Sequence, residues 1–265
     1  MDGTYHFKAE SVRNECVDWL KKQGKKANFE KVVIGMSGGK DSTIAAALCC
    51  RAFGSDNVHG LLLPNGSQPD INDSIAACNA LGIKYDTINI KPIYDSFIQQ
   101  HNTATKKSDI VSKLSEDALI NLAPRIRMTM IRLWGQSNHH RMCGTGNYSE
   151  ITVGYCTKDG DTCFDFNPLG KLTSVEVVEI GKLMKEIPKR LVTKTPSDGL
   201  CGKTDEEKLG VSYEMIHRYI RSLPMDDDVW YKINALEKAG LHKRTSSVNV
   251  YAPSEKLICT PNNTY

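Results

Sequence analysis

The chain has 265 residues, 40% of them hydrophobic, and its 34 basic and 31 acidic side chains leave a formal net charge of +3. That length and composition suffice for a full hydrophobic core, built either as one α/β domain or as one domain with a helical elaboration. The small net charge gives no support for a nucleic-acid-binding surface. Since the sequence contains no apolar run of about 18 residues, no cleavable signal peptide and no low-complexity tract, we expect a cytoplasmic protein with neither membrane nor nucleic-acid partners.

Helices and strands are predicted to alternate in the first third of the chain. The expected order is a helix over 9–22, a strand over 32–35, a helix over 42–53, a strand over 58–63, a helix over 70–81 and a strand over 84–90. Alternation of this kind is typical of a parallel sheet with helices on both faces. The sequence therefore predicts an α/β fold with a doubly wound parallel sheet.

The remainder of the chain is predicted to be mostly helical. The expected elements are helices over 94–100 and 124–137, a strand over 141–145, and helices over 174–186, 212–222 and 226–239. Two long irregular stretches, 157–173 and 191–210, interrupt them, and long irregular stretches are usually functional. We expect the second stretch, which is rich in Pro, Gly and charged residues, to form a mobile lid.

The nine cysteines do not form a recognisable metal or redox motif. They are Cys16, Cys49, Cys50, Cys78, Cys143, Cys156, Cys163, Cys201 and Cys259. No pair has the CxxC spacing of zinc, iron–sulfur or thioredoxin-like sites. Because most lie among apolar neighbours, we expect buried free thiols that act as small hydrophobic side chains.

The segment MSGGKDST at 36–43 is the most informative part of the sequence, because it follows an apolar strand and precedes a helix of small residues. Gly38 and Gly39 lack a Cβ, so the backbone amides can approach an anion closely. Ser37 and Ser42 add hydroxyl donors, and the helix dipole favours negative charge at this end. The segment predicts a loop that binds the phosphates of a nucleotide.

Asp41 places a carboxylate beside the expected phosphates, where it would repel them unless a divalent cation lay between. It is therefore interpreted as a magnesium ligand. A Walker-type loop is excluded, because Ile34 stands where its first glycine belongs and Asp41 follows the lysine. A second glycine-rich segment, 144–147, overlaps the end of the predicted strand over 141–145. We expect it to face the same crevice, since ligands of such sheets bind at the carboxyl ends of strands.

The SGGxDS pattern resembles the signature of the N-type ATP pyrophosphatases, which cleave ATP between the α and β phosphates and activate a substrate oxygen as its adenylate. The segments downstream resemble one branch of that superfamily, the NAD synthetase family, over about residues 10–245. These segments are PRIRM at 124–128, GTGNYSE at 144–150, TKDGD at 157–161, DFNPL at 165–169, DEEKLGVSY at 205–213 and LHK at 241–243.

The resemblance implies a Rossmann-like fold of the adenine nucleotide alpha hydrolase type and a C–N ligase that amidates deamido-NAD with ammonia, using ATP and Mg²⁺ and no covalent enzyme residue. It implies a homodimer as well. The residues implied to bind ATP are Gly35, Met36, Ser37, Gly38, Gly39, Lys40, Asp41, Ser42, Thr145 and Ser197. Those implied to bind deamido-NAD are Arg125, Lys158, Asp165, His242 and Lys243, and the implied magnesium ligands are Asp41 and Glu150.

The chain departs from the family pattern at two positions. Ser174 stands where many members carry a lysine, with Lys171 nearby as a possible source of the charge, and Ser197 replaces a threonine while keeping the hydroxyl. Glutamine-dependent members carry an additional glutaminase domain. Since only about 31 residues precede the first predicted strand, we expect a single domain over residues 1–265, without a glutaminase, that uses free ammonia or ammonia delivered by a separate subunit.

Several alternatives remain open from the sequence. Taken singly, Arg125 fits a solvated helix face, Glu150 fits an acid in the first turn of a helix, and His242 with Lys243 fits a helix C-terminal cap. At the level of function, one alternative is a tRNA-modifying enzyme with the same ATP loop, although the charge balance and cysteine spacing disfavour it. The other is a nucleotide-binding regulator without turnover.

Overall fold

The computed structural model describes residues 5–105, 114–194 and 204–244. At its centre is a four-stranded sheet in the order β3-β2-β1-β4, in which every neighbouring pair is parallel. The strands are β1 (Val32–Gly35), β2 (Val58–Leu62), β3 (Lys84–Thr87) and β4 (Arg141–Cys143). Val32 pairs with Val58 on one side and with Arg141 on the other, so the carboxyl ends of β1, β2 and β4 lie at one edge of the sheet.

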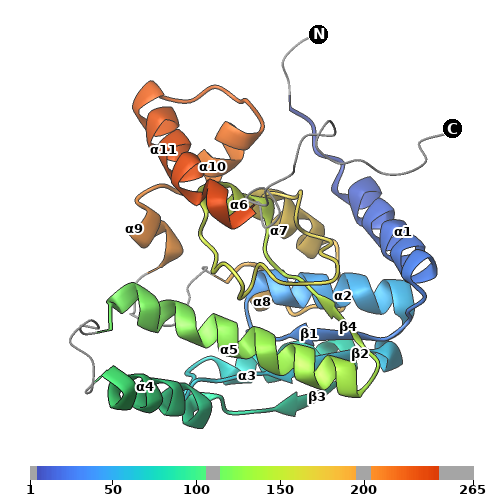
Figure 1. Cartoon of the computed structure of the whole chain (residues 1–265). Coiled ribbons are helices and arrows are strands. Elements are labelled where there is room, and N and C mark those ends of the chain that lie inside the picture. The colour runs from blue at the N-terminus through green and yellow to red at the C-terminus, as the bar shows by residue number, and fades with distance from the viewer. Residues whose placement is uncertain (1–4, 106–113, 195–203, 245–265) are drawn as a thin grey trace, which may run out of the picture.

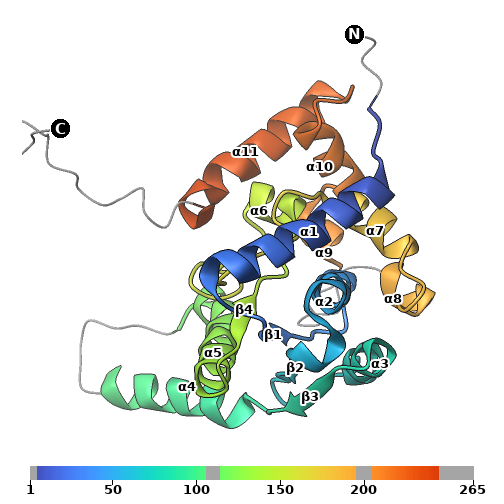
Figure 2. The ribbon, with the colours of Figure 1, turned by 90° about the vertical axis from the view of Figure 1, so that its right-hand side faces the viewer.

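Helices cover both faces of the sheet, as Figure 2 shows, and the predicted doubly wound architecture is confirmed. One face carries α1 (Ala9–Ala27), α2 (Lys40–Phe53), α3 (Ile71–Leu81) and α7 (Ser174–Lys182), and the other carries α4 (Lys91–Thr105) and α5 (Glu116–Ser137). The alternation of strand side chains explains this arrangement. Val32 and Ile34 are buried in the cluster that contains α2, whereas Val33 is buried in the cluster that contains α5.

A third group of helices lies beyond the carboxyl edge of the sheet (Figure 1). It consists of α6 (Tyr148–Val153), α10 (Tyr213–Ile220) and α11 (Asp227–Arg244). Val153, Ile216 and Ile233 form its core. Three short helices do not belong to this group: α8 (Lys189–Val192), α9 (Asp205–Leu209) and η1 (Ser55–Asn57). The segment that follows α6 lies very close to α11. A Cβ added to Gly154 would lie 2.6 Å from the Cα of Gly240.

Several helix boundaries differ from the predictions. α5 begins at Glu116, where the Ser115 side chain accepts a hydrogen bond from the Ala118 amide (3.2 Å), so Pro124 is tolerated inside the helix instead of starting it. α6 was not predicted, and α11 continues to Arg244. The expected lid over 191–210 is wrong at both ends, because α8 contains the buried Leu191 and α9 starts at Asp205.

Two further observations concern the sequence predictions. Within the described ranges, no helix combines the length and apolarity needed to cross a bilayer. All seven cysteines in those ranges are free thiols, with Cys49, Cys78 and Cys143 buried as predicted and the other four partly buried. Cys201, Cys259 and the proposed lid residue Ser197 lie outside the described residues.

Candidate active site

The loop predicted to bind phosphate, residues 36–39, joins β1 to α2 at the carboxyl edge of the sheet. Gly38 has φ = 80°, and a Cβ at this position would lie 2.9 Å from the amide nitrogen of Ser74 on α3, so a larger residue is excluded both by backbone strain and by space. The Gly39 amide donates to Ser37 Oγ (3.2 Å), which lies 3.1 Å from Ser42 Oγ. These contacts fix the loop around the N-terminus of α2, where an anion is stabilised.

Two carboxylates meet beside this loop, and one asparagine contacts both. Asn147 is fully buried at the N-terminus of α6, where its side chain accepts from the Glu150 amide (3.1 Å) and its own amide donates to Glu150 Oε2 (2.9 Å). The Asn147 Nδ2 group donates to Asp41 Oδ1 (3.3 Å). Lys40, also buried, donates to the other oxygen of Asp41 (2.6 Å).

The electrostatics of this carboxylate pair suit a divalent cation. Burial, followed by the charge of Asp41, raises the pKa of Glu150 well above its ordinary value, even though Lys40 opposes the effect. Two carboxylates in this position are stabilised by a cation between them. The described residues contain no group of three or more His, Cys, Asp or Glu side chains arranged for a metal. Two carboxylates nevertheless fit Mg²⁺, which typically takes one or two carboxylates together with substrate phosphates and water.

The loop and the carboxylates open into one cavity of about 450 Å³. Apolar side chains, among them Leu61 on β2 and Ile131 on α5, line it, and so does Thr145, in agreement with the expectation that the segment 144–147 faces the same crevice. A volume of this size is typical of small-molecule sites. The residues predicted to contact ATP that line it are Gly35, Met36, Ser37, Gly39, Lys40, Asp41, Ser42 and Thr145.

A second cavity, of about 390 Å³, is strongly cationic. It is lined by Arg132, Lys158, Lys243 and Arg244, together with Asp159, Thr162, Cys163 and Phe164. The Lys243 ammonium group donates to the carbonyl oxygens of Gly154 (2.7 Å) and Cys156 (2.8 Å), so the end of α11 is tied to the segment after α6. Two of the residues predicted to bind the acceptor, Lys158 and Lys243, therefore share one cavity.

The other three predicted acceptor residues lie elsewhere. Arg125 donates to the carbonyl oxygen of Lys158 (3.2 Å) and so positions the loop that carries this lysine. Asp165 pairs with Arg132 and accepts from the Met142 amide (2.8 Å). His242 is exposed, with its ring 3.0 Å from the Ala239 carbonyl oxygen within the last turn of α11, an arrangement that agrees with the helix-cap alternative.

Comparison with known proteins agrees with this geometry. The family model for NAD synthase matches residues 12–247. The chain belongs to the NAD synthase family. The NH(3)-dependent NAD(+) synthetase of Carboxydothermus hydrogenoformans is 32% identical to it over 237 residues, which cover 89% of this chain and 95% of that protein.

Solved structures of similar proteins have the same fold. The NMN synthetase of Francisella tularensis is 30% identical, with a TM-score of 0.81, and the match covers 97% of this chain and all of that one. The NH3-dependent NAD synthetase of Campylobacter jejuni is 25% identical, with a TM-score of 0.70, and the match covers 90% of this chain and 96% of that one. Both similarities extend over nearly the whole chain, so the family assignment covers the sheet as well as the C-terminal helices.

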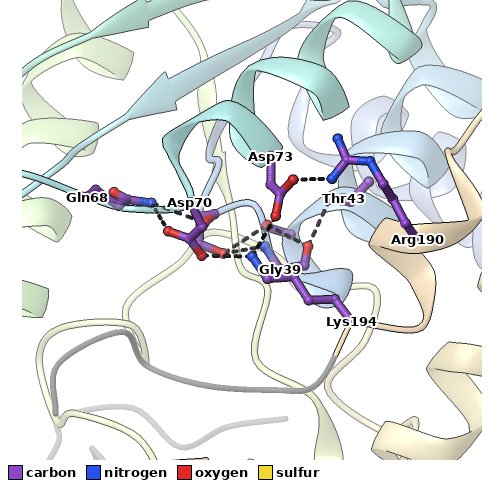
Figure 3. Close-up of polar contacts among 9 residues, drawn as sticks. Gly39, Thr43, Gln68, Asp70, Asp73, Arg190 and Lys194 are labelled. Carbon is purple, nitrogen blue, oxygen red and sulfur yellow. Dashed lines mark hydrogen bonds and ion pairs between the residues drawn. The ribbon is translucent and has the colours of Figure 1, made fainter. Parts of the chain in front are cut away.

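Asn147, which contacts both carboxylates, and three residues that line the main cavity, Asp161, Asp205 and Lys194, were not predicted as site residues. Asn147 was visible in the sequence as the partner of Glu150 in an N-x-x-E capping pattern. Asp161 lines the cavity and accepts from the Thr157 amide (2.6 Å), and burial raises its pKa. Asp205 lies in the cavity wall near the Tyr213 hydroxyl (3.2 Å), and Lys194 lies at its edge among acidic side chains (Figure 3).

The departure from the family pattern at Ser174 does not place a charge in either cavity. Ser174 is buried at the start of α7, where its amide donates to Ser149 Oγ (3.1 Å). The Lys171 ammonium group lies 4.6 Å from the centre of the Tyr148 ring, and Lys171 lines neither of the two cavities. The sequence-based idea that Lys171 replaces the missing lysine therefore has no support in this arrangement.

Proposed function

We propose that the chain is an ammonia-dependent NAD synthetase, a ligase that converts deamido-NAD to NAD while ATP is cleaved to AMP and pyrophosphate. The observation that carries this proposal is the Asp41–Glu150 carboxylate pair, joined through Asn147 beside a glycine-rich phosphate loop. A P-loop kinase would place a Ser or Thr where Asp41 stands. Family membership supports both the nucleotide and the amide-forming chemistry.

The first step of the proposed reaction joins the nicotinate carboxylate of deamido-NAD to the α-phosphorus of ATP, as the bond from that phosphorus to the pyrophosphate oxygen breaks. The phosphates are held by the amides of the loop at 37–39 and the N-terminus of α2. Asp41 and Glu150 would hold Mg²⁺, which offsets charge on the departing pyrophosphate. Lys40 stays charged in this pair, since the nearby carboxylates outweigh the effect of its burial and raise its pKa.

In the second step ammonia attacks the carbonyl carbon of the acyl-adenylate, and AMP leaves with the bonding electrons. No side chain forms a covalent bond, so the chain contributes position and charge. We assign Lys158 and Lys243 to phosphate groups of the acceptor, because cationic side chains bind phosphate oxygens through charge-assisted hydrogen bonds. Arg125 acts through the Lys158 loop, whereas Asp165 orients Arg132. Ser197 and His242 are kept as proposed contacts to ATP and acceptor.

Several finer features are part of the proposal. We propose a single-domain enzyme that takes up free ammonia, works in the cytoplasm, assembles as a homodimer and binds no nucleic acid. The names of the relatives support ammonia as the nitrogen source. The near-neutral charge supports the absence of a nucleic-acid partner.

A second acceptor is favoured by one specific observation. The structural match to the NMN synthetase, with a TM-score of 0.81, exceeds the match to the NH3-dependent NAD synthetase, at 0.70. NMN carries the same nicotinamide ring as NAD but lacks the adenylate half. The alternative reaction is therefore amidation of the nicotinate mononucleotide by the same adenylation chemistry.

The test is a product assay with both acceptors. Purified protein is incubated with ATP, Mg²⁺, ammonium and either deamido-NAD or nicotinate mononucleotide, and the amide product and AMP are quantified by chromatography. We expect NAD and AMP in equal amounts from deamido-NAD and a lower kcat/KM with the mononucleotide. The reverse ranking would favour the NMN reaction. AMP without either amide would indicate a different acceptor, and absence of AMP would indicate a nucleotide-binding regulator.

A further inference from the structure

Three cationic side chains line the main cavity within the described ranges: Lys40, Arg127 and Lys194. Lys40 is buried and already paired with Asp41 (2.6 Å). Arg127 donates its Nε–H to the carbonyl oxygen of Leu63 (2.9 Å), at the end of β2. Lys194 differs from both, because it lies directly after the α8 segment and, among the residues that the structure describes, only two carboxylates at the start of α3 hold its ammonium group.

Those two carboxylates lie against the phosphate loop. Lys194 Nζ donates to Asp70 Oδ2 (2.8 Å) and to Asp73 Oδ2 (2.7 Å), as Figure 3 shows. A Cβ placed on Gly38 would be 3.1 Å from the Asp73 Cβ. Gln68 connects the same group to the loop, since its amide nitrogen donates to both Asp70 Oδ1 (3.0 Å) and the Ser37 carbonyl oxygen (3.3 Å).

Lys194 can leave these carboxylates at small cost. Arg190 also contacts Asp73, so this carboxylate keeps a cationic partner when Lys194 moves. Asp70 is 36% exposed and keeps its hydrogen bond from Gln68. Ion pairs in contact with water contribute about 0–1 kcal/mol. A bound triphosphate, with several negative charges and many acceptor oxygens, competes favourably with such a pair.

We propose that Lys194 binds the β- and γ-phosphates of ATP and stabilises the departing pyrophosphate, with the Asp70–Asp73 pair holding its side chain ready when no nucleotide is bound. The assignment rests on the proposed ATP-cleaving function and adds a residue to it. As the bond between the α-phosphorus and the bridging oxygen breaks, the electron pair passes to that oxygen, and the Lys194 ammonium group offsets the added charge by hydrogen bonding. No proton is transferred by the lysine.

Arg190 provides a matched control for this assignment. Arg190 and Lys194 reach the same Asp73 carboxylate from neighbouring positions, but only Lys194 lines the cavity. If Lys194 merely ties the α8 segment to α3, removing either cation should have similar effects. If Lys194 binds phosphate, only its removal should weaken phosphate affinity.

The experiment measures binding of inorganic pyrophosphate, with Mg²⁺ present, by titration calorimetry of the full chain. We expect Lys194→Met to weaken affinity about 10- to 100-fold, the loss of one charged hydrogen-bonding partner. Lys194→Arg should restore affinity to within about threefold of wild type, and Arg190→Met should change it by less than that. Melting temperatures of all variants identify any variant that fails to fold.

Asp70→Asn tests whether the ion pair or the lysine itself matters, because it breaks one of the two ion pairs that Lys194→Met removes while leaving the lysine in place. Retained pyrophosphate affinity in Asp70→Asn, with a loss in Lys194→Met, supports the proposal. Equal losses in these two variants, equal effects of Lys194→Met and Arg190→Met, or no binding by the wild-type protein would overturn it. The binding experiment needs no acceptor, so it is independent of the proposed ligase reaction. If the protein makes no NAD but Lys194→Met still weakens its pyrophosphate affinity, the ligase reaction is contradicted and the role of Lys194 is supported.

Discussion

Two capping boxes of the same chain, at the starts of α6 and α7, have the same backbone geometry and opposite electrostatics. In each, the N-cap side chain accepts from the amide of a glutamate three residues later, and that glutamate accepts from the N-cap amide, at 2.9 Å for Asn147–Glu150 and 2.8 Å for Thr173–Glu176. Both glutamates satisfy helix amides. Local structure alone therefore does not distinguish them.

Their surroundings do distinguish them. Arg221 donates two hydrogen bonds to Glu176 (2.7 and 2.6 Å) and Tyr5 donates another. Burial alone would raise the pKa of Glu176, but these partners outweigh it and hold the pKa below its ordinary value. Glu150 instead faces Asp41, and its pKa is raised. A capping glutamate opposite an arginine has its charge partner within the fold, whereas one opposite a second carboxylate supports the proposed cation site.

The largest expected effect separates the two glutamates by activity. Glu150→Gln should lower kcat for NAD formation about 100- to 1,000-fold, because one of the two carboxylates that position the cation is lost. Glu176→Gln, assayed below its melting temperature, should keep kcat within about threefold of wild type, since it touches neither cavity. Steady-state kinetics at saturating ATP measure both. Equal losses in the two variants would remove the distinction.

The next effect separates them by stability. Glu176→Gln leaves Arg221 without its carboxylate partner and should lower the free energy of unfolding by roughly 2–3 kcal/mol. This lies below the 3–5 kcal/mol of a fully buried pair, because Arg221 keeps some contact with water. Urea denaturation, analysed for a change of midpoint at constant slope, gives the value. Arg221→Met should show a similar loss, and an unchanged midpoint in both variants would mean that the ion pair contributes nothing.

The pH dependence of stability should have opposite signs at the two positions. The raised pKa of Glu150 means that the folded, metal-free protein holds a proton that the unfolded chain has released, so this residue lowers stability as pH rises from 4.5 toward about 8. The lowered pKa of Glu176 means that its contribution is lost as pH falls below 4.5. In EDTA at pH 8, the free energy of unfolding of Glu150→Gln should exceed that of wild type by roughly 1–2 kcal/mol. This value is discounted because Glu150 is partly exposed.

Melting curves between pH 3.5 and pH 8.5 check this prediction, with Glu176→Gln as the paired variant. The advantage of Glu150→Gln should shrink toward pH 5 and disappear when Mg²⁺ and ATP are added to both proteins. A constant difference across this range would show that Glu150 does not titrate there.

The smallest effect concerns Asn147. Asn147→Ser keeps a good N-cap acceptor for the Glu150 amide but removes the hydrogen bond to Asp41. The Mg²⁺ concentration for half-maximal activity should rise about threefold, as expected for one weak hydrogen bond. Ser115→Ala, which removes the α5 cap at a residue that does not line the cavity, should leave that concentration unchanged. A rise in both variants would assign the effect to general loss of helix stability.

The sheet and the phosphate loop are predictable from sequence because their signals are local. A β-branched run followed by SGGKDS specifies a strand, a glycine turn and a helix N-terminus without reference to the rest of the chain. Residues 147–150 and 173–176 both carry a capping pattern, which is also a local signal. The start of α6 could therefore have been predicted from the sequence. The predicted start of α5 at Pro124 was wrong. Prolines favour the first turn of a helix, but here the cap at Ser115 sets the start.

The rest of the site depends on contacts between distant segments. Nothing local in the sequence indicates that Arg132 pairs with Asp165, or that Arg221 neutralises Glu176 while Asp41 faces Glu150. For the same reason Lys194 could not be placed beside Asp70 and Asp73 before the fold was known. Residue type and spacing predicted residues that line the main cavity, and tertiary packing determined their charge partners.

The most direct test of this account measures metal binding at the carboxylate pair. Mn²⁺, used in place of Mg²⁺, is titrated into wild-type protein, Glu150→Gln and Glu176→Gln in the presence of a non-hydrolysable ATP analogue, and free Mn²⁺ is followed by electron paramagnetic resonance. The account predicts that Glu150→Gln loses about tenfold or more in Mn²⁺ affinity, while Glu176→Gln binds as wild type does. Wild-type affinity in Glu150→Gln would show that the Asp41–Glu150 pair is not the cation site.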